Sequence, residues 1–262
     1  MLRAMRTAAS GMMAQQLFVD TIANNLANIN TTGFKKARAR FEDLLYQTTR
    51  PAGLPSGSGT ATPMATQIGH GSRIVGTEKL FGQGDTEVTG NPFDVEIQGD
   101  GFLQFLSPSS EIVYSRDGAL RLDAQGRVVS GMGYPLEPAI TLPQETVSVY
   151  ISPEGEVQAT SSGGSEPQVI GRIELARFTN EAGLEAVGGN FMKKTAASGE
   201  PIVAAAGESG LGTLSQGTLE RSNVQVVDEM VAMIVAQRAY EINAKAIQTA
   251  EEMMSQTNNL KR

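Results

Sequence analysis

The chain of 262 residues lacks cysteine and tryptophan and contains one histidine. Without cysteine it has no disulfide, no thiol nucleophile and no cysteine-ligated zinc. The histidine, His70, lies between two glycines, and no nucleophile-elbow sequence occurs that would place a serine beside it. The sequence therefore indicates no catalytic residue, no metal site and no cofactor.

Long apolar runs are also absent. No segment approaches the roughly 20 apolar residues of a membrane-spanning helix. No apolar signal-peptide core follows Arg3 and Arg6, so we expect no membrane insertion and, if the chain is exported, no cleaved leader. The formal net charge of −7 argues against nucleic acid as a partner.

The N-terminal region carries the first positive pattern, a spacing of seven between apolar residues that is typical of a coiled-coil seam. It predicts a helix over 5–29, about 37 Å long. One line of the seam contains Met5, Met12, Val19 and Leu26, and the other contains Ala8, Ile22 and Ile29. Beyond it, Gly33 is predicted to take the left-handed conformation that ends a helix.

Three asparagines, Asn24, Asn25 and Asn28, lie near the end of this helix. Each costs about 0.5 kcal/mol as a helix residue. Two interpretations stay open: ordinary surface polarity, or amides that bond to neighbouring chains. On a merely solvated face nothing would offset that cost.

No Gly or Pro occurs between Ser222 and Arg262, which predicts a long C-terminal helix capped at Ser222–Asn223. Its main apolar stripe contains Met233, Tyr240, Ile247 and Met254, with Ile242 close by. Together with neighbouring apolar residues, this surface is wider than one partner helix requires. Either the helix is buried in its own domain, or the surplus surface contacts other chains; we favour the second because the intervening residues predict strands and no further helices.

Short alternating strands with turn signals fill the middle of the chain. Gly99 and Gly101 bracket a predicted bend, and Asp117–Gly118 has the composition of a hairpin turn. The predicted fold class is α+β, with long N- and C-terminal helices pairing as a coiled-coil-like core and an antiparallel β-rich middle domain. The expected divisions are 1–45 (helix and its exit), 46–92 (connecting region, linker-like at 51–71), 93–190 (β domain), 191–220 (Gly/Ser-rich return) and 221–262 (helix).

Two groups of charged residues are predicted to lie in solvent. In an alternating strand, Asp94 and Glu96 should share one solvated face. A basic patch with interleaved phenylalanines should also be solvated and contact an acidic neighbour. The patch contains Lys35, Lys36, Arg38 and Arg40.

Both ends carry a family resemblance. "ANNLANINTTGFKKARARFEDLLYQT" (23–48) and "SNVQVVDEMVAMIVAQRAYEINAKAIQTAEEMM" (222–254) resemble the terminal signatures of the flagellar axial family, the rod and hook proteins. "IQGDGFLQF", "YSRDGAL" and "RFTNEAGLEAVGGNF" are similar to segments of the family's β domain, in the expected order. The length and the passage "QIGHGSRIVGTEKLFGQG" look like the distal rod members, whereas hook proteins are longer.

This resemblance implies a non-enzymatic subunit of a helical tube in the basal body, spanning periplasm to outer membrane. Such a tube transmits torque from motor to hook and encloses the export channel. Implied partners are further copies of the chain, proximal rod proteins, the hook protein, ring proteins and the export apparatus. Alternatives are a proximal rod protein, a rod-borne cell-wall hydrolase, which the scarcity of aromatics and histidine disfavours, and a soluble adhesin or carrier.

On this interpretation we predict subunit-interface residues on both terminal helices. They are Met5, Met12, Val19, Ile22, Asn24, Asn25, Leu26, Asn28, Ile29, Met233, Tyr240, Ile242, Ile247 and Met254.

Overall fold

The computed structural model describes residues 2–52, 55–56, 60–61, 64–161 and 167–259. The chain forms two compact units. The helical unit comprises Met1–Leu26, Ala37–Glu78 and Gln225–Arg262, and the β unit comprises Ala27–Lys36 and Lys79–Val224. The chain therefore passes between the units four times, and each unit is built from segments far apart in the sequence.

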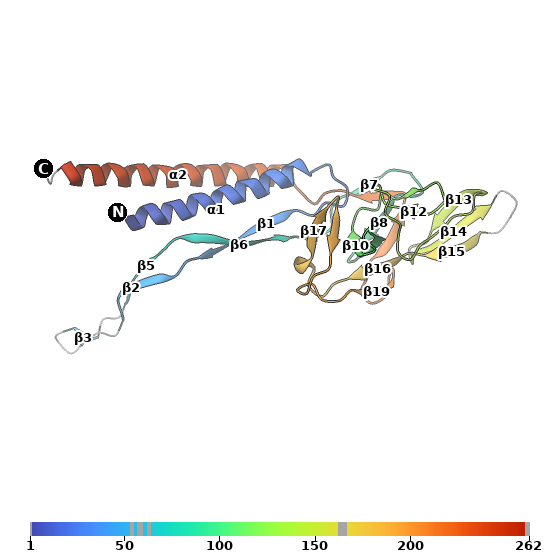
Figure 1. Cartoon of the computed structure of the whole chain (residues 1–262), viewed down its shortest axis with the longest axis horizontal. Helices are drawn as coiled ribbons and strands as arrows, with labels where there is room; N and C mark the ends of the chain where they lie inside the picture. Colours follow the sequence, from blue (N-terminus) through green and yellow to red (C-terminus); the bar gives the residue numbers. More distant parts are fainter. Residues whose placement is uncertain (1, 53–54, 57–59, 62–63, 162–166, 260–262) are drawn as a thin grey trace. The chain divides into compact units, whose positions relative to one another are not determined.

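In the helical unit, α1 (Leu2–Ala27) and α2 (Val226–Asn259) lie side by side and run in opposite directions (Figure 1). Both predicted helices are confirmed, but their ends differ from the prediction. Helix α1 stops at Ala27, and the N–H of Gly33, whose φ is 65°, donates to the carbonyl of Glu220 at 2.8 Å. Gly33 is therefore left-handed but does not cap the helix.

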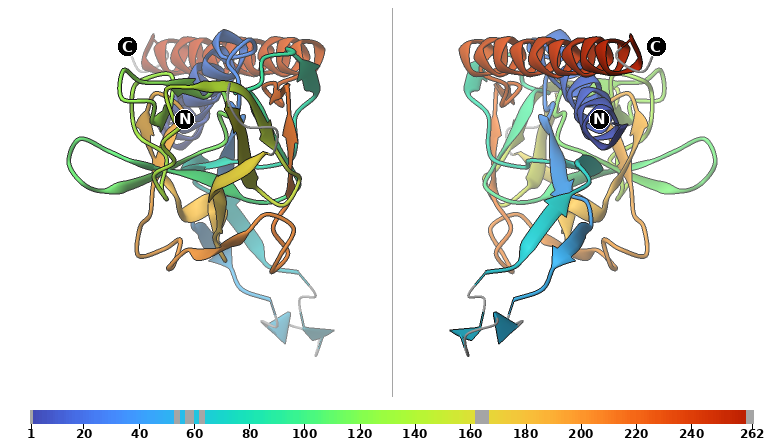
Figure 2. Two further views of the ribbon diagram at one scale, coloured as in Figure 1. Left: turned by 90° about the vertical axis from the view of Figure 1, so that its right-hand side faces the viewer. Right: turned by 90° about the vertical axis from the view of Figure 1, so that its left-hand side faces the viewer.

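The helical unit also contains a β arm, in which Figures 1 and 2 show the β2–β5 ribbon continuing from the β1–β6 pair. The arm consists of three two-stranded ribbons, β1–β6, β2–β5 and β3–β4. The six strands are β1 (Ala37–Asp43), β2 (Tyr46–Arg50), β3 (Pro55–Ser56), β4 (Thr60–Ala61), β5 (Thr66–Gly69) and β6 (Ser72–Lys79). Part of the linker-like stretch 51–71 thus forms strands; residues 53–54, 57–59 and 62–63 of it lie outside the described residues.

The β unit contains the remaining strands in antiparallel sheets, as predicted. Its largest sheet has the order β17-β18-β10-β9-β16-β19, and a three-stranded sheet has the order β13-β14-β15. Two-stranded ladders join β20 to β8, β21 to β7 and β11 to β12. The strands are β7 (Thr86–Val88), β8 (Val95–Gln98), β9 (Phe102–Leu106), β10 (Ile112–Ser115), β11 (Arg121–Leu122), β12 (Val128–Val129), β13 (Thr146–Ile151), β14 (Glu156–Ser161), β15 (Gln168–Arg172), β16 (Glu174–Arg177), β17 (Glu185–Gly188), β18 (Phe191–Lys193), β19 (Ile202–Ala205), β20 (Thr213–Gln216) and β21 (Thr218–Glu220), with a 3-10 turn at Glu181–Gly183.

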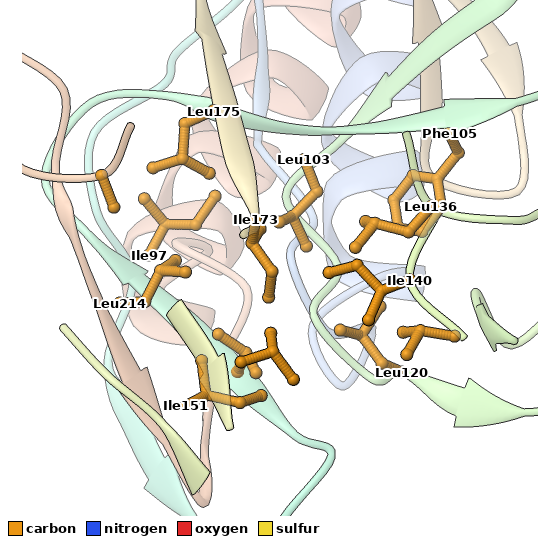
Figure 3. Packing of buried hydrophobic residues seen from close by; sticks show 14 of the residues in the cluster. Ile97, Leu103, Phe105, Leu120, Leu136, Ile140, Ile151, Ile173, Leu175 and Leu214 are labelled. Atoms are coloured by element: carbon orange, nitrogen blue, oxygen red, sulfur yellow. The ribbon is translucent and has the colours of Figure 1, made fainter. Parts of the chain in front are cut away.

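The core of the β unit is mainly aliphatic, as the shortage of aromatics requires. Side chains from strands and from the segments between them converge in it, among them Leu103, Leu136, Ile173 and Leu175 (Figure 3). A smaller cluster contains Phe102, Tyr114 and Phe178 with edge-to-face ring contacts. Because strands from residues 95 to 214 contribute to one core, the β unit has the internal packing needed to fold by itself.

Two predicted turns can be compared with the structure. Gly99 and Gly101 lie between β8 and β9 with positive φ angles of 113° and 135°. The hairpin at Asp117–Gly118 is wrong, because β10 pairs with β9 and β18 while β11 pairs with β12. A Cβ at Gly118 would collide with the carbonyl oxygen of Val95, whose N–H donates to the Gly118 carbonyl at 3.0 Å. Glycine there permits a close backbone approach and not a turn.

The solvated face predicted for Asp94 and Glu96 is also wrong. Asp94 is buried and accepts hydrogen bonds from Thr89, Asn91 and Arg121 at 2.7–2.9 Å. Glu96 is buried as well and accepts from Thr86 at 2.8 Å. Strand β8 is covered on both faces. Hydroxyl, amide and guanidinium donors bond both carboxylate oxygens of Asp94, whereas in Glu96 only Oε1 has such partners.

The basic patch is divided in the structure. Arg38 and Arg40 are exposed on β1 and pair with Glu78 at 2.5 and 2.8 Å, an acidic neighbour within the same chain. Lys35, in contrast, is fully buried in the β unit beside Glu220. The prediction of a solvated Lys35 is wrong because its charge has a buried partner 185 residues away in the sequence.

Candidate assembly interface

The apolar side chains that α1 and α2 bury are mostly small. They are Ala8, Ala14 and Ile22 on α1 and Ala236 and Ala250 on α2. A Cβ added at Gly11 would lie 3.0 Å from the amide of Asn243, so the backbones approach closely there. The helices thus pair through a narrow seam and leave most of their large apolar side chains outside it.

A buried polar contact closes the seam at one end. The side chain of Asn25, 2% exposed, accepts from the N–H of Ala37 and donates to the Ala37 carbonyl, both at 2.9 Å. It also donates to the Glu229 carboxylate of α2 at 3.1 Å. The prediction that Asn25 bonds a neighbouring chain is therefore wrong, because its amide is used within the chain to join α1, β1 and α2.

Asn25→Ala is expected to raise the concentration threshold for self-assembly roughly tenfold. The substitution leaves the Ala37 amide and the Glu229 carboxylate without this partner, which costs about 1–3 kcal/mol. Sedimentation across a concentration series measures the threshold, with exposed Thr7→Ala on the same helix as the matched control. An unchanged threshold would show that the contact does not help to hold the helix pair in its assembly-competent form.

Outside the seam, α2 presents a row of exposed large apolar side chains, each at least 52% exposed, which we call the apolar face. It consists of Val227, Met230, Val231, Ile234, Val235 and Ile242. Met13 and Leu17 are exposed in the same way on α1. Exposed large apolar side chains gathered on one helix in this way indicate a site of interaction.

The predicted stripe on α2 coincides with this face only in part. Met233, Ile247 and Met254 are half-buried, whereas Tyr240 and Ile242 are exposed. On α1, Met5, Met12, Val19 and Leu26 are half-buried, Ile22 is buried within the chain, and Asn24 is exposed. Ile29 and Asn28 are half-buried beyond the end of α1, and Asn28 accepts a hydrogen bond from Thr31.

Five members of the apolar face are absent from the predicted interface, namely Val227, Met230, Val231, Ile234 and Val235. They do not follow the chosen sevenfold lines, and the signal that could have found them is the breadth of apolar sequence in "VVDEMVAMIVA". The sequence shows that a surplus exists, but the position of α1 decides which side chains make it up.

Two grooves in the helical unit accompany the apolar face. One, of about 410 Å³, is lined by residues of both helices, including Val19, Asp20 and Tyr240. The other, of about 460 Å³, lies between α1 and the β1–β6 pair and is lined by Leu17, Asn24 and Ile74 among others. Contact of Phe18 with Phe41, at 5.6 Å between ring centroids, holds α1 against β1 beside it. Together with the apolar face, the grooves give a surface with ridges and recesses for another protein.

His70 lies in the loop between β5 and β6 and is half-exposed. Within the described residues, no three side chains of the His, Asp and Glu types come together as metal ligands would. Neither α1 nor α2, over the part described, is both long and apolar enough to cross a membrane.

Three family models match the chain in order. They are "Flagella basal body rod protein" over residues 5–35, "Flagellar hook protein FlgE/F/G D1 domain" over 96–159 and "Flagellar basal body rod FlgEFG protein C-terminal" over 215–260. The first and last of these contain most of α1 and α2.

Curated relatives agree along the whole chain. The chain is 51% identical to the flagellar basal-body rod protein FlgG of Borreliella burgdorferi, with 100% of both chains covered. It is 47% identical to FlgG of Caulobacter vibrioides, covering 99% of this chain and 100% of the relative. Its 39% identity to the flagellar hook protein FlgE of Helicobacter mustelae covers 52% of this chain and only 30% of that protein.

Proposed function

Because the chain belongs to the flagellar basal-body rod protein family, we propose that it is a structural subunit of the distal rod, which polymerises into a helical tube. The observation that carries this proposal is the apolar face left exposed on the paired terminal helices. When two different surfaces of a subunit meet in successive copies of the chain, the copies form a ring or an open helical filament. Full-length agreement with rod proteins, against 30% coverage of a hook protein, favours rod over hook.

In the proposed rod, the helical units of many subunits bury one another's apolar faces and form the inner wall around the export channel. Torque then passes along the tube from motor to hook. The rod crosses the periplasm to the outer membrane, where proximal rod proteins, the hook protein, ring proteins and the export apparatus are its expected partners. The proposed role is mechanical, without catalysis.

Complementation tests this proposal. In a motile bacterium whose own distal-rod gene is deleted, expression of this chain is expected to restore swimming and full-length rods in isolated basal bodies. Rods that still stop short while the chain is exported would contradict the distal position, and recovery only in a strain lacking a proximal rod gene would assign it there.

Removing residues 52–65 is expected to change the length or curvature of the polymer but not the melting of the β unit. These residues belong to the helical unit, so the aliphatic core of the β unit is unaffected, and surface segments alter stability only slowly with length. Calorimetry and electron microscopy of the same preparation measure both properties. Loss of the β-unit transition in the deletion variant would place these residues in the folding of that unit.

A further inference from the structure

Three segments of the β unit meet at the points where the chain leaves it for the helical unit. They are residues 33–36, 80–85 and 220–223, which we call the collar. Lys36, Lys79 and Val224 are the residues of the β unit at three of the four chain crossings. The first segment follows α1 in sequence and the last precedes α2.

Each collar segment is hydrogen-bonded to both of the others. Gly33 N–H donates to the carbonyl of Glu220 at 2.8 Å, and Leu80 N–H donates to the carbonyl of Lys36 at 2.9 Å. The third side is closed at Asn223, whose Nδ2 donates to the Leu80 carbonyl at 2.8 Å and whose Oδ1 accepts from Lys36 N–H at 2.8 Å. The sequence predicted that Asn223 helps to cap α2. In the structure Asn223 instead bonds the collar segments, and α2 begins at Val226.

A buried ion cluster lies at the centre of the collar. Lys35 Nζ is 2.5 Å from Glu220 Oε1, with both side chains 1% exposed. Glu220 Oε1 also accepts from Gly84 N–H at 2.8 Å. The guanidinium of Arg116, fixed by two hydrogen bonds to the Gly99 carbonyl, approaches Glu220 Oε2 to 3.6 Å. One carboxylate thus compensates two buried cations.

Burying the charged side chains of this cluster costs free energy. Burial lowers the pKa of Lys35, the charge of Arg116 lowers it further, and Glu220 opposes both. Buried ion pairs are rarely more stabilising than apolar side chains of the same volume, so they are weak evidence for stability alone. Gly33 adds a steric requirement, because a Cβ there would lie 2.6 Å from the Asp117 nitrogen. The collar is therefore a specific joint rather than an extension of the core.

We propose that the collar is the joint that carries tension between the two ends of the chain. Tension applied through α1 enters the β unit before residue 33, and tension applied through α2 enters it after residue 223. These two entry segments are bonded directly to each other, so their bonds are loaded before the core cluster is. In the rod, a role that rests on the proposed function, this joint would keep the β unit folded while the helices transmit torque.

The balance of buried charges predicts how Lys35→Met, Glu220→Gln and the double variant change the stability of the β unit. Lys35→Met leaves Arg116 and Glu220 as a one-to-one pair, and the Gly82 carbonyl keeps Asn223 as a donor. Glu220→Gln removes the carboxylate that contacts both buried cations and leaves only the weaker influence of Glu181, which should lower the melting temperature of the β unit by roughly 10 °C. Adding Lys35→Met to Glu220→Gln should recover part of this loss, which is the signature of coupling in a double-mutant cycle.

Pulling single full-length chains from their two ends in an optical trap tests the proposal. At a fixed force, Glu220→Gln should raise the unfolding rate of the β unit on the order of a hundredfold. The control is a core variant with an equal loss in melting temperature, Val157→Ala or, for a larger loss, Leu175→Ala, both far from the collar in sequence and buried in the main core. The control should raise the rate markedly less under tension.

Equal unfolding rates for collar and core variants of matched melting temperature would overturn the proposal. If Glu220→Gln does not fold, Lys35→Met is compared with its own matched core variant, and the same criterion applies. The measurement uses one chain and no polymer. A negative result therefore leaves the proposed rod function standing, while failed complementation would leave the pulling result intact.

Discussion

Ile242→Asp is expected to abolish polymerisation while leaving the β unit unchanged. Ile242 is 69% exposed in the single chain, so a carboxylate there costs nothing before assembly. In the proposed polymer it would be buried against a neighbour, where an unpaired carboxylate costs several kcal/mol. Since about 1.4 kcal/mol is a tenfold change in an equilibrium constant, the threshold concentration should rise at least about a hundredfold.

The matched control is Gln248→Asp, which introduces the same charge at an exposed polar position of the same helix. It should polymerise almost normally, as sedimentation would show, and calorimetry should give both variants the β-unit transition of the parent chain. Ile247, half-buried beside α1, is less suitable because its substitution would also disturb the helix pair. Normal tubes from Ile242→Asp would mean that this part of α2 faces solvent in the polymer.

Hydrogen exchange should show the terminal helices nearly unprotected in the free subunit and strongly protected in the polymer. The seam buries few and mostly small side chains. Ordering the 26 residues of α1 and the 34 residues of α2 costs about 1–2 kcal/mol for every residue. We expect protection of both helices to rise roughly a thousandfold on assembly, while β-unit amides are protected throughout. Comparable protection of α1 and α2 in dilute monomer would show that the seam alone holds them.

The sequence predicted those features that depend on local pattern. The sevenfold apolar spacing located both helices, alternation predicted the antiparallel β-rich middle domain, and the terminal motifs carried the family. The strands of the β arm were not predicted, because most of them lie in the stretch assigned to a connecting region. What it missed depends on residues far apart in the chain. Lys35 has its counter-charge 185 positions away, and Asn25 bonds across 204 positions to Glu229. The sequence analysis assigned Lys35 to solvent and Asn25 to a neighbouring chain, and only the fold shows that both are buried and bonded within the chain.

The same limit applies to the candidate interface. Breadth of apolar sequence in α2 predicted surplus surface, but the Ala236 and Ala250 seam determines which side chains are left outside. The Asp117–Gly118 error has a similar origin, because a dipeptide with strong hairpin preference is used here for close approach to Val95.

A helical reconstruction of the polymer by electron cryo-microscopy tests the central claim most directly. At high concentration the purified chain should form tubes in which the helical units line the inner wall and Val227, Ile234 and Ile242 are buried against neighbouring subunits. Tubes in which these side chains face solvent, or a chain that forms no polymer at any concentration at which its relatives do, would contradict the account.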